Sequence, residues 1–436
     1  MISTTRPAAR LGILATLAIV LLAACTPSSN SDEPTRFVAP SKPAAPAPPP
    51  STGGGAVQAP DANLRAWETP ARMIPTSNRS ADWAQRYWNH ADEWDKNWTI
   101  EFGFDEPSND YSVPVYSAAD ATTTTRIFQR PPSSWNGRFD IPSGSTIPWN
   151  PSWLPSDGND GFMVIVDPAS GKEWDVWAMS TPLFNPDYLK QTECIMEPGF
   201  NPDADLCAAG VLVIAHPDGQ TADVRSYRGN YPIASGGGLQ NTAGLTTPDE
   251  VKSGAIRHAL KFMVSGRLAM MGPQCPADVT SADDPRVGST CGVAVAPAGQ
   301  FERIHMNASS EQLSQMVPHG TRLVIDMTDA QIEAWLNSRG YTGTLRNTAR
   351  IFAVALRDYG LIQTDTTGGP ALIQVSGARN AATAAGWREL GIEGDGVNLL
   401  DGLVTSTNIR VLAAPTNHCQ SGPSRLACWA SDIRYG

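Results

Sequence analysis

The chain has little charge, and the two signs are unbalanced. Charged side chains make up 17% of its 436 residues, and 43 acidic residues face only 32 basic ones. Nucleic-acid binding needs a basic patch or stripe, so this acidic balance argues against a nucleic-acid partner. The chain is rich instead in glycine, proline, threonine and tryptophan, which is typical of a secreted protein with many loops and strands.

Several motifs that would assign a chemistry are also missing. There is no Gly-x-Ser-x-Gly elbow, no P-loop and no zinc-protease motif. No Cys-x-x-Cys or His-x-x-x-His spacing occurs, so we expect no metal and no cofactor. Oxygen atoms of Asn201, Asp203 and Asp205 could bind calcium, but their spacing lacks the glycine and the final glutamate of an EF-hand loop.

The N-terminal apolar run is too short to cross a membrane. It begins at Leu11 and covers about 13 residues, whereas a transmembrane helix needs about 20. Arg6 and Arg10 precede it, and the small residues Ala23 and Ala24 lead directly into Cys25. This pattern predicts that residues 1–24 are a lipoprotein signal peptide and that Cys25 carries the lipid.

The predicted signal places the mature protein outside the cytoplasm. We expect it to be anchored through its N-terminal lipid to the bacterial cell membrane or to an outer membrane. Residues 25–64 are rich in proline, glycine and serine and cannot bury apolar surface, so they are predicted to form a disordered tether. No second linker follows, and residues 65–436 are predicted to be one globular domain with a helical insertion around 328–360.

Six cysteines are left once Cys25 carries lipid. They fall into three close pairs, and each pair brackets a segment rich in proline, glycine or aspartate that looks like a loop. An oxidising compartment favours disulfides, although six thiols can pair in several ways. We predict three sequential disulfides: Cys194–Cys207, Cys275–Cys291 and Cys419–Cys428.

Short β-branched or aromatic runs bounded by turn residues indicate strands at 111–116, 161–167, 173–178, 210–215 and 255–264. They follow one another without helices between them, which favours a mainly β protein, an antiparallel β-sandwich, over βαβ units. A capping box at Thr328 and a helical-period stripe that ends at Tyr359 predict a C-terminal helical pair packed against the sandwich. The segments 361–364 and 371–375 are then predicted to pair with each other as strands.

Five of the thirteen tryptophans lie between residues 67 and 98. Ser80 can cap a helix there, and aromatic residues then recur near one helix face. These are Trp83, Tyr87, Trp94 and Trp98. Such rings can stack on sugars, but they are more often buried, so we expect them to belong to the core.

Part of the chain resembles a group of secreted, largely uncharacterised bacterial proteins. The shared pattern is DEV..G.I.HAL.F, then G.RL, then A..AL..YG. The first two are found here at Asp249–Phe262 and Gly320–Leu323, and the third is represented within Ala349–Leu361 by Ala349, Ala355-Leu356 and Tyr359-Gly360. The resemblance covers roughly residues 160 to 375 and implies a jelly-roll β-sandwich that acts on carbohydrate, without assigning catalytic residues. This chain departs from the group's AGLPI.PGL region, which is reduced here to Gly238–Leu245.

The main candidate for chemistry is the strand at 173–178. Residues two apart on a strand share a face, so Glu173, Asp175 and Trp177 should project together. Glycoside cleavage uses two carboxyl groups, and an aromatic ring beside them gives a sugar a surface to stack on. The alternative interpretation is an edge strand whose acids are solvated.

This strand is similar to the E-x-D-x-x-E strand of the laminarinase-like jelly-roll hydrolases. Ala178 occupies the position of that motif's third acid. The missing carboxyl group would then have to come from Asp249 or Glu250.

His258 is a further candidate, because imidazole titrates near neutral pH and can act as a general base. Its predicted strand position points it to the apolar side, so a packed core histidine is the alternative.

We therefore expect a cell-envelope lipoprotein that binds or processes polysaccharide. The catalytic candidates are Glu173, Asp175 and His258, and the ligand-binding candidates are Trp177, Asp249 and Glu250. The other hypothesis is a non-catalytic structural or assembly lipoprotein of the envelope, and the sequence does not decide whether the protein is an enzyme.

Overall fold

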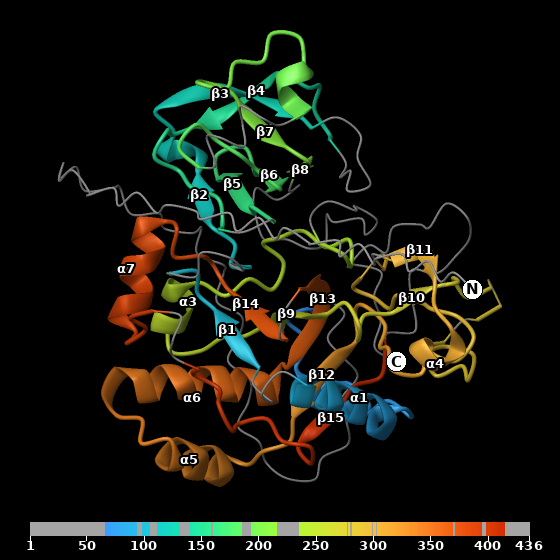
Figure 1. The fold of residues 1–436 in the computed structure, drawn as a ribbon. Coiled ribbons are helices and arrows are strands. Elements are labelled where there is room, and N and C mark those ends of the chain that lie inside the picture. The colour runs from blue at the N-terminus through green and yellow to red at the C-terminus, as the bar shows by residue number, and fades with distance from the viewer. Residues whose placement is uncertain are drawn as a thin grey trace, which may run out of the picture. The chain divides into compact units, whose positions relative to one another are not determined.

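The computed structural model describes seven stretches of the chain, drawn as the coloured ribbon in Figure 1. They are residues 66–93, 98–104, 111–130, 139–157, 160–184, 193–215 and 235–414, with short gaps at 277, 280, 299, 302, 369–370 and 395–397. The predicted signal peptide, the lipid anchor at Cys25, the tether and the Cys419–Cys428 disulfide lie outside the described residues.

The largest sheet has six strands. In order across the sheet they are β1 (Thr99–Glu101), β14 (Leu372–Gln374), β9 (Leu260–Ser265), β13 (Leu361–Thr367), β12 (Arg322–Ile325) and β15 (Ile409–Val411). β9 is antiparallel to β14 and parallel to β13. The prediction that 361–364 pairs with 371–375 is therefore wrong, although both segments are strands. β9 is buried along its whole length. Because it lies between β14 and β13, the backbone groups on both of its edges have hydrogen-bonding partners.

The two faces of this sheet differ in chemistry. Leu260 and Phe262 lie on an apolar face that belongs to the same core as residues of α1 (Ser80–Glu93) and α6 (Gly343–Asp358). A largely polar row crosses the other face, because residues paired across neighbouring strands share a face. The row consists of Glu101, Gln374, Lys261, Ile362 and Arg322. A covered face of this kind needs internal partners for its polar groups.

Two smaller sheets come from the region between β1 and β9. One contains β2 (Val115–Ser117), β5 (Met163–Asp167), β6 (Lys172–Trp177) and β8 (Gly210–Ala215), in that order. The other contains β4 (Ser145–Trp149), β3 (Thr123–Gln129) and β7 (Leu206–Ala208). The turn residues from Asp167 to Lys172 predict a hairpin between two of the expected strands. This prediction is confirmed, since β5 and β6 pair antiparallel with Asp167 opposite Lys172. A short parallel pair joins β10 (Met271–Gly272) to β11 (Arg303–Asn307).

The remaining α-helices follow β8 in the chain. They are α3 (Pro248–Lys252), α4 (Ser310–Leu313), α5 (Asp329–Ser338) and α7 (Ala381–Glu389). Three short 3₁₀ helices precede β8, namely η1 (Ala71–Met73), η2 (Ala118–Asp120) and η3 (Glu193–Met196). The capping box at Thr328 and Gln331 is confirmed and opens α5, which packs against α6. No helix among the described residues combines the length and the apolar character needed to cross a membrane.

The prediction of a strand-rich protein is confirmed, but the pairing is mixed rather than antiparallel. Five of the eleven strand pairings among the described residues are parallel. Parallel partners such as β9 and β13 come from distant parts of the chain, and the local order of strands and turns carries no signal for such pairing. Six α-helices accompany the fifteen strands described, so helices contribute more than the predicted pair.

The described tryptophans of the N-terminal region belong mainly to the core, as expected. Trp67, Trp83 and Trp98 are buried. Trp98 lies just before β1 rather than on the helix, and its ring packs 5.0 Å from Phe262. Ser80 is the first residue of α1 rather than its N-cap, and its hydroxyl accepts the backbone N–H of Val411 on β15.

Candidate functional site

The alternation predicted for the strand at 173–178 is confirmed on β6. Trp174 and Val176 pack into an apolar core on one face, and Glu173 and Asp175 project from the other. β6 lies between β5 and β8, so it is not an edge strand. Both carboxylates are fully buried, at 0% exposure. The acids therefore line neither an open groove nor a solvated edge.

Residues 235–246, which we call the covering segment, account for this burial. The backbone N–H of Asn241 donates a hydrogen bond of 2.7 Å to Asp175 Oδ2. The Thr242 hydroxyl donates to both carboxylate oxygens of Glu173, at 2.8 and 2.9 Å. The covering segment thus binds both acids through groups that a substrate would otherwise have to replace.

The same segment connects the acids to the central sheet. Lys261 of β9 is fully buried, and its ammonium donates a 2.9 Å hydrogen bond to the side-chain oxygen of Asn241. Gly236 N–H donates to Asp365 Oδ1 on β13 at 2.7 Å. We call Glu173, Asp175, Asn241, Thr242 and Lys261 the acid–lysine cluster. It joins β6 to β9 through one loop.

Burial dominates the electrostatics of this cluster. It raises the pKa of Glu173 to about 7, against the hydrogen bonds from Asp175 and Thr242. It also raises the pKa of Asp175 well above its ordinary value, and the adjacent charge of Glu173 adds to that rise. Burial lowers the pKa of Lys261 to about 8, although the neighbouring carboxylates favour its charged form. The acid pair therefore retains a proton near neutral pH.

The cluster is not completely paired. Among the described residues, Asp175 Oδ1, Asn241 Nδ2 and both amide atoms of Gln240 are buried without a hydrogen-bond partner. Unpaired buried polar atoms destabilise the folded state, so the surrounding packing must offset this loss of stability. In glycosidases, by contrast, the two carboxyl groups flank an accessible bond of the sugar. The geometry found here suits an internal polar junction better than a substrate cleft.

His258 lies in a separate pair. It precedes β9 rather than standing on it, and it is nearly buried. One ring nitrogen, Nε2, lies 3.0 Å from Glu250 Oε2, and the other, Nδ1, lies 2.8 Å from the carbonyl oxygen of Ala259. Glu250 belongs to α3, whose first turn also carries Asp249 beside Lys252. The histidine thus holds α3 against the start of β9.

Trp177 ends β6 on the same side as the acids but is only half-buried. Its indole N–H donates to Asp160 Oδ1 at 3.1 Å. The ring position is therefore fixed by a hydrogen bond within the protein.

Asp205, one of the residues considered for calcium, is ion-paired with Arg126 at 2.6 Å. No group of three or more His, Cys, Asp or Glu side chains suited to a metal occurs among the described residues.

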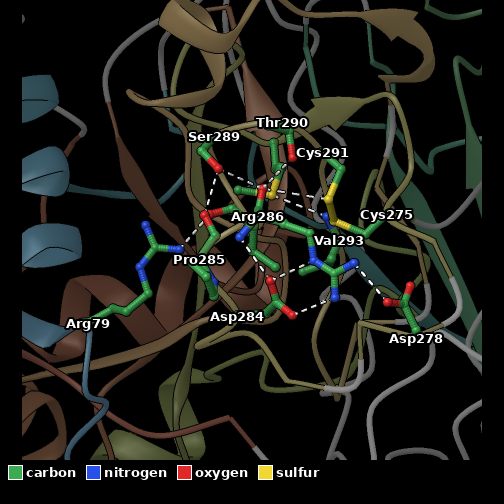
Figure 2. The surroundings of a disulfide bond; sticks show 12 residues. Arg79, Cys275, Asp278, Asp284, Pro285, Arg286, Ser289, Thr290, Cys291 and Val293 are labelled. Carbon is green, nitrogen blue, oxygen red and sulfur yellow. Dashed lines mark hydrogen bonds and ion pairs between the residues drawn. A yellow bond between two sulfur atoms is a disulfide. The ribbon is translucent and has the colours of Figure 1, made fainter.

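Two of the three predicted disulfides are confirmed, Cys194–Cys207 and Cys275–Cys291. Figure 2 shows the second one, with the Arg286 guanidinium between the carboxylates of Asp278 and Asp284. The bond closes the loop from 275 to 291, which follows β10 in the chain. Both disulfides are consistent with an oxidising, extracytoplasmic environment.

A pocket of about 360 Å³ that no sequence motif indicates lies beside α1, α4 and the turn after β9. Its polar lining consists of Arg86, Asn89, His90, Arg267, Gln312 and Gln315, and its apolar lining of Leu268, Met271 and Met316. Among the described residues, no acidic side chain lines it. Because the lining comes from three separated segments, no local spacing in the sequence marks it.

Arg86 gives this pocket a rigid wall. Its guanidinium donates to both carboxylate oxygens of Asp82, at 3.0 and 2.9 Å. It also donates to the backbone carbonyls of Leu313 and Met316, at 3.3 and 2.7 Å. These bonds fix the end of α4 against α1. Arg267 is exposed on the pocket lining, in contrast to Arg86.

No protein-family model, curated protein or solved structure matches this chain.

Proposed function

We propose that this chain is a lipid-anchored protein of the bacterial envelope that binds polysaccharide without cleaving it. The observation that carries the proposal is the pocket beside α1 and α4, whose lining combines amide, guanidinium and imidazole groups with an apolar wall. Ligand sites of about 300 to 1,000 Å³ usually have this mixture, and this pocket lies at the small end of that range. It suits one sugar unit or the end of a glycan chain.

The lining also indicates the charge of the ligand. The protein as a whole has a formal charge of −11, yet the described residues that line the pocket include Arg86, Arg267 and His90 and no acid. Charge-assisted hydrogen bonds from arginine to a carboxylate or sulfate are stronger than bonds to neutral groups. We therefore propose an acidic glycan, with Arg267 as the principal contact because its side chain is exposed on the pocket lining whereas Arg86 is buried.

Burial of the acid–lysine cluster supports the non-catalytic part of the proposal. Glu173 and Asp175 have no exposed surface, and the covering segment already occupies their hydrogen-bonding positions. The jelly-roll arrangement implied by the resemblance stays a proposal as well. The antiparallel run β5–β6–β8 is the part of the fold closest to it.

The proposal is tested with the full lipoprotein in detergent, on an array of acidic, furanosidic and glucan oligosaccharides. We expect binding to acidic members, a loss of affinity of about tenfold or more in Arg267→Ala, and unchanged affinity in Arg350→Ala. Arg350 is a matched control, since it is an exposed arginine paired with Glu333 away from the pocket. A reducing-end assay should detect no product.

Two outcomes would change the assignment. Release of reducing ends that is lost in Glu173→Gln would make the protein a glycoside-cleaving enzyme. Absence of binding to every class of glycan would favour the structural or assembly role. The bonding of Arg86 agrees with that second role, because its guanidinium donates hydrogen bonds to groups within the protein.

A further inference from the structure

Two adjacent exposed apolar side chains directly follow a cysteine of one disulfide. Among the described residues, four large apolar side chains are exposed: Leu183 at 59%, Ile195 at 49%, Met196 at 79% and Met306 at 54%. Ile195 and Met196 directly follow Cys194 in η3. Leu183 lies three residues after Ser180, which pairs with Cys207, the other half of the same disulfide. Isolated exposed apolar residues are common, but Ile195 and Met196 are adjacent and so are not scattered singly.

The fold holds the Ile195–Met196 turn firmly. Cys194 is bonded to Cys207 on β7, and β7 pairs with β3. Beneath the turn, Phe128 packs with both cysteines and with Phe200 in a small apolar cluster. A rigid, preformed apolar turn loses little conformational entropy when it enters an apolar environment.

The charges nearby indicate which kind of surface the turn fits. From Glu193 to Leu206 the chain has four acidic residues and no lysine or arginine. The neighbouring Arg126 is neutralised by Asp205 at 2.6 Å and also donates to the carbonyl of Gly199. Attraction to anionic lipid needs clustered basic residues, so it cannot be the driving force here.

We propose that the Ile195–Met196 turn inserts into the surface of the membrane that anchors the protein, through apolar contact with uncharged phospholipid. The inference rests on the proposed lipid anchor. Forty residues, the length of the predicted tether, span at most about 140 Å even when fully extended. Two or three apolar side chains hold a free protein only weakly, but an anchored domain meets the bilayer at a high effective concentration.

The test reconstitutes the full lipoprotein into vesicles of phosphatidylcholine that carries a diazirine in its acyl chain. After illumination, mass spectrometry of the digest should locate lipid adducts on the peptide containing Ile195 and Met196. We expect the adduct yield on this peptide to fall about tenfold or more in Met196→Asp. Met306→Asp is the matched control, because it places the same change at an exposed methionine on β11.

Two controls test whether a loss of lipid adducts comes from misfolding. They are a second variant, Met196→Ser, and mapping of the Cys194–Cys207 bond. Mixing phosphatidylglycerol into the vesicles should not raise the yield. Adducts confined to the N-terminal peptide, or equal effects of Met196→Asp and Met306→Asp, would overturn the proposal. A dimer that Met196→Asp dissociates, without lipid adducts at the turn, would overturn it in favour of a second copy. Failure of the anchor itself is detected separately, by membrane fractionation.

Discussion

At the scale of single residues, the acid–lysine cluster is where the fold departs most from ordinary packing. Two carboxyl groups and an ammonium group, all without solvent exposure, are held by one backbone N–H, one hydroxyl and one amide. Buried ionisable groups of this kind contribute little net stability, because the cost of desolvation offsets the attraction between them. They nevertheless make the fold sensitive to protonation.

Glu173→Gln should remove part of the pH dependence of stability. A buried acid whose pKa rises from 4.5 to about 7 stabilises the folded state fully below pH 4.5 and loses that contribution as pH rises to about 7. The contribution of Glu173 to the free energy of unfolding should therefore fall by about 3 kcal/mol across this window. We expect the glutamine variant to have a flatter profile in urea denaturation at several pH values.

Glu333→Gln provides the control for that experiment. Glu333 is an exposed acid with arginine partners whose pKa lies below its ordinary value, so its replacement should leave the slope between pH 4.5 and 7 unchanged. A Glu173→Gln profile that is as steep as that of the unmodified protein would contradict the prediction.

At the scale of elements, the covering segment carries the connection between β6 and β9. It can follow this path because Gly244 adopts a φ of +68° and lies against the ring of Trp67. A Cβ atom at Gly244 would stand 2.3 Å from that ring, closer than any van der Waals contact. Trp67 is itself buried, so it has little room to move.

Gly244→Ala should therefore destabilise the protein by about 2 to 5 kcal/mol, as the sum of a left-handed alanine and an overpacked core. Gly254→Ala is the matched variant, since Gly254 also has a positive φ but no atom within 4 Å of its Cβ position. It should lose only the conformational part, about 1 to 2 kcal/mol. Equal midpoints of thermal unfolding in the two variants would show that the contact with Trp67 carries no cost.

Elements specified by neighbouring residues could be predicted from the sequence. The capping box at Thr328, the hairpin at 167–172 and the two-residue alternation around Glu173 and Asp175 depend on spacing alone. Burial of the acids could not be predicted, because it depends on a segment more than sixty residues further along the chain. One signal did exist, since Gly238–Leu245, where the chain departs from the proteins it resembles, lies within that covering segment.

At the scale of the whole molecule, the membrane attachment that we propose is a lipid on Cys25, which lies outside the described residues. We expect Cys25→Ala to move the protein from the membrane fraction to a soluble or mislocalised form, since its thiol is the predicted lipid acceptor. Fractionation and the mass of the N-terminal peptide measure this. Unchanged fractionation without an acyl group on that peptide would exclude the anchor.

The position of β9 between β14 and β13 governs the order in which the chain can fold. An exported chain emerges N-terminus first, so β9 is present long before β13 arrives to pair with it. Until then its unpaired N–H and C=O groups are an open template for other strands, and closing so long a loop is slow. Cys275 and Cys291 both lie inside this interval. Their oxidation ahead of β13 bypasses 16 residues of the loop that remains to be closed, so disulfide formation should accelerate completion of the central sheet by a small factor.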